Sequence, residues 1–136
     1  MKRAYLFIAL AVTSCATVSS HRFAEPTADW QTRSGQLLYR NASRTVIGDV
    51  LVRTSPAGDF ELTFAKGPGV ALLRIRQDAS HAAVSGALAR MGWSGATASA
   101  PKQLRGWLGL REAILRAPQQ RSIHHSFNGE TFHLRF

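Results

Sequence analysis

The stretch Phe60-Glu61-Leu62-Thr63-Phe64 carries the clearest pattern in the chain. Its three large apolar side chains alternate with polar ones, and successive side chains of a β-strand point to opposite faces of a sheet. The stretch is therefore predicted to be a strand with one apolar face. Since such a face must be buried against another layer of structure, this strand predicts a sheet with one covered side.

Alternation of the same kind continues on both sides of this stretch. Residues 31–41 and 45–54 are predicted strands before it, and residues 70–77 are a predicted strand after it. Turn-forming sequences separate some of these segments, namely Ser-Pro-Ala-Gly-Asp at 55–59 and Gly-Pro-Gly at 67–69. Because strands joined by short turns pair antiparallel, the four strands are predicted to form a meander.

A helix is expected after Pro101, which suits a first helical turn because its missing N–H needs no partner there. The apolar residues that follow recur at helical spacing and predict a buried stripe made of Leu104, Trp107, Leu108 and Leu115. Gly106 and Gly109 weaken this helix, and a break is expected near Gly109. The segment is the predicted cover for the apolar face of the sheet.

The remaining segments complete the predicted sheet. Residues 81–86 fit either a fifth strand or the start of a short helix, and residues 92–100 are expected to form a loop around Trp93. Asn128-Gly129 is the favoured pair for a two-residue hairpin turn. The chain is therefore predicted to close on a hairpin whose last strand alternates large apolar and polar side chains.

Together these elements predict an α+β fold, an antiparallel sheet with one or two short helices as a lid. The side chains predicted to line the covered face are Leu37, Tyr39, Val50, Val52, Phe60, Leu62, Phe64, Leu73, Ile75, Phe132 and Leu134 from the strands, with Leu104, Trp107 and Leu108 from the lid. These residues form either a closed core or the wall of an apolar ligand cavity, because the alternation is the same in both cases.

The first twenty residues have the order of a secretory signal. Lys2-Arg3 precede an apolar run at residues 4–12, which is shorter than the roughly 20 residues of a membrane-spanning helix. The stretch Val-Thr-Ser-Cys at 12–15 resembles the bacterial lipobox, in which cleavage before an invariant Cys lets its thiol carry a diacylglyceryl group. The resemblance implies a lipid anchor at Cys15. The alternative is an ordinary signal peptide with a chance Cys.

Three regions follow from the lipobox interpretation. They are a lipoprotein signal peptide at 1–14, a small and polar lipidated tether at 15–29, and a single domain at 30–136. Ala16 stands where enterobacterial lipoproteins retained in the inner membrane have Asp, so by analogy the anchor is expected on the periplasmic face of the outer membrane.

The chain is basic, with 17 Lys and Arg against 8 Asp and Glu and a net charge of +9. In the cell envelope such a surface meets anionic lipid or acidic protein, so nucleic acid is not an expected partner. Arg74 and Arg76 share one side of their strand and predict a basic outer face. The single Cys excludes a disulfide framework and a zinc site of four thiolates, and the chain has no Gly-rich phosphate-binding motif.

Two sharper chemical interpretations of the C-terminal hairpin are not favoured. His124, His125 and His133 with Glu130 suit zinc or copper, but adjacent histidines of a strand point to opposite faces, so solvated hairpin groups are expected and no metal site. A hydrolytic set of Ser122, His125 and Glu130 lacks the Gly-x-Ser-x-Gly pattern around its nucleophile. The protein is therefore expected not to be an enzyme, to have no catalytic residue and to need no cofactor.

The order of lipobox, meander, helix and hairpin resembles the LolA/LolB-like family, the periplasmic lipoprotein carriers and outer-membrane lipoprotein receptors of the Lol pathway. The resemblance covers the chain from about Trp30 to Leu110. It lies in the order and spacing of four segments, Trp30-Gln31-Thr32-Arg33 with Gly35, Asp59 to Phe64, Leu72 to Ile75, and the Leu-Arg-Gly-Trp-Leu run at 104–108. None of these segments is catalytic.

The resemblance implies a strongly curved sheet, a half-open barrel whose concave apolar face binds the acyl chains of a lipoprotein or phospholipid. It implies a role in lipoprotein localisation, with a periplasmic lipoprotein carrier as partner, and a membrane-facing loop at Lys66, Gly67, Pro68 and Gly69. The chain departs from the family by its shorter length and by Pro68, which replaces a protruding leucine that helps to insert cargo. The alternative is a structural or interaction lipoprotein of the envelope with a closed core.

Overall fold

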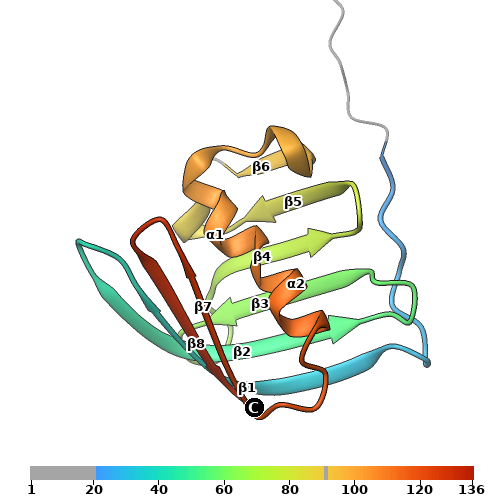
Figure 1. Cartoon of the computed structure of the whole chain (residues 1–136), viewed down its shortest axis with the longest axis horizontal. Coiled ribbons are helices and arrows are strands. Elements are labelled where there is room, and N and C mark those ends of the chain that lie inside the picture. The colour runs from blue at the N-terminus through green and yellow to red at the C-terminus, as the bar shows by residue number, and fades with distance from the viewer. Residues whose placement is uncertain (1–20, 91) are drawn as a thin grey trace, which may run out of the picture.

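The alternating stretch at 60–64 lies in the middle of an eight-stranded antiparallel sheet (Figure 1). The structure, a computed structural model, describes residues 21–90 and 92–136. Its strands are β1 (Gln31–Arg40), β2 (Thr45–Thr54), β3 (Phe60–Ala65), β4 (Ala71–Gln77), β5 (His81–Ser85), β6 (Trp93–Ala96), β7 (Ser122–Phe127) and β8 (Glu130–Arg135). The order across the sheet is β6-β5-β4-β3-β2-β1-β8-β7, so the predicted meander is confirmed and the C-terminal hairpin extends it beside β1.

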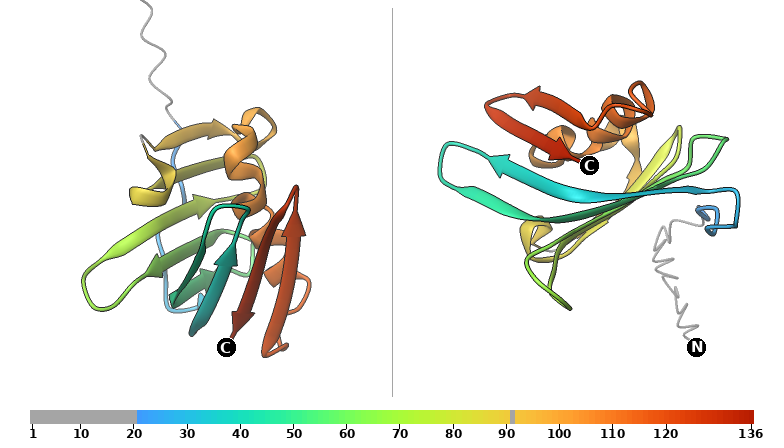
Figure 2. Two further views of the ribbon diagram at one scale, coloured as in Figure 1. Left: turned by 90° about the vertical axis from the view of Figure 1, so that its left-hand side faces the viewer. Right: turned by 90° about the horizontal axis from the view of Figure 1, so that it is seen from below.

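The helical part of the chain lies between β6 and β7. It consists of the 3-10 turns η2 (Thr97–Ser99) and η3 (Lys102–Leu104), followed by α1 (Arg105–Leu108) and α2 (Leu110–Leu115), with a further turn η1 (Ala87–Ala89) before β6. The segment from η3 to α2 crosses one face of the sheet, and the sheet coils so that β7 and β8 stand over the same face (Figure 2). We call this the inner face and the opposite one the outer face. No helix in the described ranges has the length and apolar character needed to cross a membrane.

The fourteen apolar residues predicted for the covered face are all buried in one cluster on the inner side. The most exposed of them, Leu104, has only 7% of its surface accessible. Leu110 and Ile114 are also buried, whereas Leu115 is only half-buried, so its predicted place in the stripe is wrong. The buried stripe continues from Trp107 to Leu110 and Ile114 at spacings of three and four residues, which leaves Leu115 beside it.

Two other segments have different outcomes in the structure. The undecided stretch at 81–86 contains strand β5, whereas the loop predicted at 92–100 is wrong because β6 pairs with β5 there. β6 has the sequence Trp-Ser-Gly-Ala, whose small residues have little preference for strands, so pairing with a neighbour overrides local preference. The hairpin at Asn128-Gly129 is confirmed, and both residues have the positive φ that its turn type requires, 49° and 83°.

The outer face carries the N-terminal segment, residues 21–29, which is the described part of the predicted tether. Arg76 donates a hydrogen bond to the carbonyl of Ala24 at 3.2 Å and pairs with Glu25 at 3.1 Å. Glu61 pairs with Arg53 at 2.6 Å and with Arg76 at 3.3 Å, so acidic groups offset part of the predicted basic face. The predicted signal peptide and Cys15 lie outside the described residues.

A glycine in β1 permits the close pairing of the C-terminal strand. A Cβ atom at Gly35 would lie 1.9 Å from the carbonyl oxygen of Arg135, a backbone atom that cannot move without breaking the sheet. Only from Gln36 onward does β1 pair with β8. Gly35 thus stands where the backbone of β8 approaches β1 too closely for any side chain.

We predict that Gly35→Ala lowers the free energy of unfolding by about 1–3 kcal/mol or more, because the added methyl group separates β1 from β8. Urea denaturation followed by circular dichroism measures the change. Ser34→Ala, an exposed neighbour on the same strand, is the control and should stay close to the parent chain. Equal stability of the two variants would contradict this interpretation of the β1–β8 contact.

Candidate functional site

A pocket of about 590 Å³ opens at one end of the inner face. It lies where the β1–β2 turn, the β7–β8 turn, η1 and η3 meet, and it is lined by Tyr39, Asn41, Arg44, Leu88, Ala89, Arg90, Gly92, Trp93, Pro101, Lys102, Gln103, Leu104, Trp107, Asn128 and Glu130. Its volume falls in the range of small-molecule sites, about 300–1,000 Å³. Of the fourteen residues predicted for the apolar face, only Tyr39, Leu104 and Trp107 line it.

The inner wall of the pocket is an aromatic cluster around Trp107. Its indole lies 4.7 Å from the ring of Tyr39, 5.8 Å from Phe64 and 4.9 Å from Phe132, the last nearly edge to face at 80°. Such pairs contribute about 0.5–1.5 kcal/mol each beyond the burial of their area. Trp107 therefore fixes α1 over β1, β3 and β8, and its partners give the pocket a firm wall.

Two glycines let the helical segment come this close. A Cβ atom at Gly106 would lie 2.7 Å from Oε1 of Glu130 and 3.2 Å from the ring of Phe132, and one at Gly109 would lie 2.6 Å from Nε2 of His125. The expected break at Gly109 is confirmed, since α1 and α2 meet there. The structure also shows why a larger residue would not fit at either position. The helical segment approaches β7 and β8 too closely there for a side chain.

One buried polar group connects this wall to the rim. The hydroxyl of Tyr39 donates a hydrogen bond to the carboxylate of Glu130 and accepts one from Nδ2 of Asn41 at 3.1 Å. Burial, together with the carboxylate of Glu130, raises the pKa of Tyr39 to about 12. Tyr39 is therefore neutral at physiological pH and acts as a fixed donor in the wall.

The rim of the pocket is basic and exposed. Arg44, Arg90 and Lys102 all line the mouth, whereas Glu130 is the only acidic residue among the lining side chains and is already bonded to Tyr39. The rim therefore presents positive charge to solvent beside the partly exposed side chains of Leu88 and Trp93, and the rings of Tyr39 and Trp107 lie buried beneath. Such an arrangement suits an amphiphile with an anionic head and an apolar tail.

The predicted membrane-facing loop, Lys66 to Gly69, lies at the same end of the sheet as the pocket mouth. All four residues are exposed, and a Cβ atom at Gly67 or Gly69 would meet nothing within 4 Å. Val70, which follows directly, is 54% exposed although it is apolar. The loop therefore projects into solvent and carries one positive and one apolar side chain beside Pro68.

The C-terminal histidines divide between the two faces of their hairpin, as predicted. His124 stacks on His133 with ring centroids 3.8 Å apart, and Nε2 of His133 lies 3.0 Å from Oγ of Ser122. His125 points to the inner face against Phe132, and Glu130 is held by Tyr39. Neither the metal set nor the hydrolytic set weighed for this hairpin is brought together.

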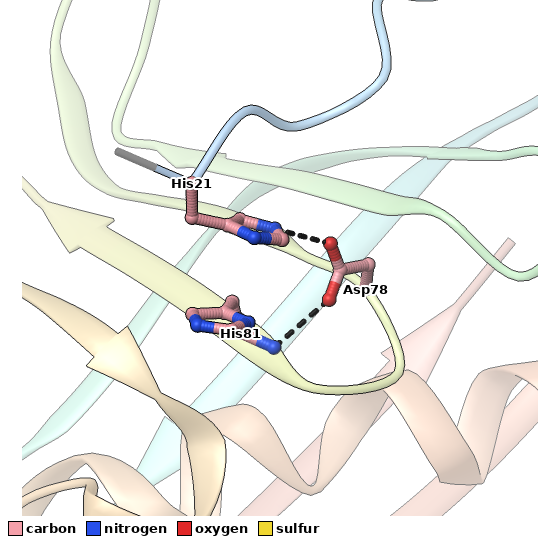
Figure 3. Close-up of side chains that lie close together, drawn as sticks. All are labelled: His21, Asp78 and His81. Carbon is pink, nitrogen blue, oxygen red and sulfur yellow. Dashed lines mark hydrogen bonds and ion pairs between the residues drawn. The ribbon is translucent and has the colours of Figure 1, made fainter. Parts of the chain in front are cut away.

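The structure brings together a group that sequence reasoning missed, His21, Asp78 and His81 (Figure 3). Nε2 of His21 lies 2.6 Å from Oδ2 of Asp78, and the rings of His21 and His81 stack with centroids 3.8 Å apart and planes 9° apart. It is the only set of three His, Cys or acidic side chains with metal-ligand spacing among the described residues. No spacing in the sequence signals it, because His21 lies 57 residues from Asp78.

Asp78 is the charged centre of this group. Burial alone would raise the pKa of Asp78, but backbone hydrogen bonds from Ser80 and His81, together with His21, lower it to about 2. The side chain is therefore a carboxylate at every physiological pH. Its Oδ1 accepts the backbone N–H groups of Ser80 at 2.9 Å and His81 at 2.8 Å, which leaves Oδ2 to face His21.

No family model matches this chain, and a search of curated proteins finds no match. A function for the chain therefore rests on the pocket, the rim and the histidine group.

We predict that Tyr39 titrates with a midpoint of about 12 in the folded protein. In the chain without its first fourteen residues Tyr39 is the only tyrosine, so absorbance at 295 nm reports this group alone. Because the folded pKa is raised, the stability that Tyr39 contributes is present below about pH 10 and is lost as the pH rises toward 12. A midpoint near 10, with the circular dichroism spectrum still that of the folded state, would contradict the buried hydrogen bond to Glu130.

Proposed function

We propose that this chain is a lipid-anchored protein on the periplasmic face of the outer membrane, which binds acyl chains of a phospholipid or lipoprotein in the pocket beside Trp107. The anchor is the lipobox at Cys15. The observation that carries the ligand is the pocket itself, whose aromatic and aliphatic wall lies directly under a basic rim. The protein acts by binding and needs no reaction.

The chemistry of the pocket supports an amphiphile over a wholly polar or wholly apolar ligand. Trp93 and Leu88, which are both partly exposed, offer apolar contact area at one place, and the buried indole of Trp107 lies behind them. Arg44 and Lys102 lie at the mouth, where each basic side chain near an anionic lipid surface contributes about 1 kcal/mol. An acyl tail enters the pocket while its head remains at the rim.

The likeness to the LolA/LolB-like family belongs to the same proposal. An open antiparallel sheet with a short helical lid on its apolar face supports the half-barrel that the family has. A role in lipoprotein localisation then follows, with a periplasmic lipoprotein carrier as the partner that delivers cargo. Pro68 replaces the family's leucine in the loop, and Val70 is the apolar side chain that remains exposed there.

A second candidate is favoured by a different observation. The apolar residues under the helical segment fill their space, with Leu37, Phe64 and Leu134 at 0% exposure. This packing supports an interaction lipoprotein of the envelope whose core is closed and whose partner binds the outer surface. The two candidates differ in whether the pocket beside Trp107 holds a lipid.

We predict saturable binding of an environment-sensitive apolar fluorophore to the chain from residue 15 onward with Cys15→Ser. A purified triacylated lipoprotein or a single-chain anionic phospholipid should displace the dye. Leu88→Glu places a carboxylate in the pocket and should weaken dye binding at least about tenfold, which corresponds to about 1.4 kcal/mol. Circular dichroism confirms that each protein is folded.

The matched control is Leu51→Glu, which changes a 41% exposed leucine of β2 that does not line this pocket. It should bind the dye as the parent chain does. Absence of binding by the folded parent, or an equal loss in both variants, would sink the ligand proposal and leave the interaction lipoprotein. Displacement by only one of the two lipids identifies the source of the acyl chain.

The anchor is tested separately from the pocket. In a Gram-negative host grown with radiolabelled palmitate, the full-length chain should become labelled and fractionate with the outer membrane. Cys15→Ser should abolish the label, because no other residue of the chain offers a thiol. A labelled Cys15→Ser variant, or an unlabelled parent chain that is secreted and cleaved, would show that the lipobox interpretation is wrong.

A further inference from the structure

The segment that precedes β1 is held against the outer face by several contacts. The guanidinium of Arg76 is bonded to Ala24 and Glu25 and also lies 5.6 Å from the centre of the Phe23 ring. The Phe23 ring in turn packs edge to face against the imidazole of His21, with ring centroids 4.9 Å apart. His21 therefore has a defined place above the β4–β5 turn. Its imidazole is brought to a turn whose own sequence is Asp-Ala-Ser-His at 78–81.

We propose that His21, Asp78 and His81 bind a divalent transition-metal ion of the zinc and copper class on the outer face of the sheet. One ligand atom from each of the three side chains lies within 4.8 Å of the other two. Imidazole nitrogen and carboxylate oxygen together suit zinc, copper and nickel, whereas magnesium and calcium prefer oxygen ligands alone. The site needs no cysteine.

The ligand atoms lie close enough to share an ion once one ring of the stack turns, because a ring nitrogen binds a metal in the plane of its ring and the rings of His21 and His81 are nearly parallel. Zinc lies about 2.0–2.2 Å from nitrogen and oxygen ligands, so neighbouring ligand atoms are roughly 3.3 Å apart. The 2.6 Å hydrogen bond between His21 and Asp78 opens, and the ring of His21 carries its proton on Nδ1, so that a neutral imidazole offers Nε2 to the ion. The carboxylate stands beside the edge of the imidazole stack (Figure 3), and side chains that are 25% and 20% exposed at His21 and Asp78 leave room for the ion to enter.

Neighbouring groups already orient Asp78 and His81 by hydrogen bonds, as the residues behind the ligands do in metal sites. Asp78 is fixed through Oδ1 by two backbone N–H groups, which leaves Oδ2 for the ion. Oγ of Ser80 lies 2.9 Å from Nδ1 of His81 and 3.3 Å from Oδ1 of Asp78. Hydrogen bonds of this kind, which hold ring and carboxylate in place, are the usual surroundings of histidine and aspartate ligands.

The second stacked pair in the molecule lacks what this one has. His124 and His133 also stack at 3.8 Å, but among the described residues no carboxylate joins them at ligand distance. Their neighbour is the hydroxyl of Ser122. His124 and His133 thus provide an internal comparison, a pair of stacked imidazoles without an acidic ligand.

Bound metal would fix the segment that follows the proposed anchor. This consequence rests on the proposed function, whereas the metal site itself does not depend on it. Cys15 precedes His21 by six residues, so with His21 fixed the anchor lies within about 20 Å of the β4–β5 turn. The loop at 66–69 lies at the opposite end of β4. The metal would therefore hold the pocket end of the domain away from the membrane, whereas without it the segment keeps only its weaker contacts, among them those of Phe23, Ala24 and Glu25 with Arg76.

Isothermal titration with zinc chloride tests the site in the untagged full-length chain with Cys15→Ser, in mild detergent and a non-chelating buffer. Removal of the thiol excludes a strong zinc ligand outside the group, and the lipid anchor plays no part. We expect one zinc ion per chain. His21→Ala and His81→Gln should each weaken binding at least about tenfold, the lower end of what loss of a supporting group costs such sites.

Asp78→Asn is the second line of test, because it keeps an oxygen for the turn and removes only the charge. It should weaken zinc binding and, because the charge of Asp78 also stabilises the fold without metal, lower the melting temperature, while the circular dichroism spectrum stays that of the parent. The matched control is the double variant His124→Ala, His133→Ala, which should retain the site. Absence of binding by the folded parent chain, unchanged affinity in His21→Ala, or loss of the site in the double variant would overturn the proposal.

Discussion

The packing of one indole determines how the two layers of this protein meet. Trp107 projects from α1 into a space formed by Tyr39, Phe64 and Phe132, which come from three strands that span the centre of the sheet. Without that contact a helical segment of two short helices has little stability of its own, since isolated helices need about 12–15 residues. The apolar face of the sheet and the short helices therefore depend on each other.

The same contact divides the inner face into a filled part and an open part. Beneath α1 and α2 the side chains are packed as a core. On the N-terminal side of Trp107 the cover consists only of the 3-10 turn η3, and the pocket opens between η3, η1 and the β1–β2 and β7–β8 turns. Basic side chains gather at that opening, and the exposed loop at 66–69 lies at the same end. The proposed lipid site and the proposed metal site consequently occupy opposite faces and opposite ends of the sheet.

The sequence predicted most of the fold because its strands alternate strictly. Leu62 and Phe64 stand two residues apart, so they share a face, and both lie in the core. β6 was not predicted, because its small residues have little preference for strands and form one only by pairing with β5. The pocket was only partly predicted. Alternation of apolar and polar residues identifies the buried face of the sheet but does not show where the helical segment stops covering that face. His21 could not be predicted as a partner of Asp78, because their meeting depends on the path of the N-terminal segment over the folded sheet.

The most direct test of the central claim follows the three indole N–H signals of the protein by proton–nitrogen NMR. Trp93 and Trp107 line the pocket, whereas Trp30 precedes β1 and does not. Titration with a single-chain anionic lipid, kept below the concentration at which it forms micelles, should shift the signals of Trp93 and Trp107 saturably and together while that of Trp30 stays in place. Signals that remain unchanged, or that all shift alike without saturation, would contradict a lipid site beside Trp107.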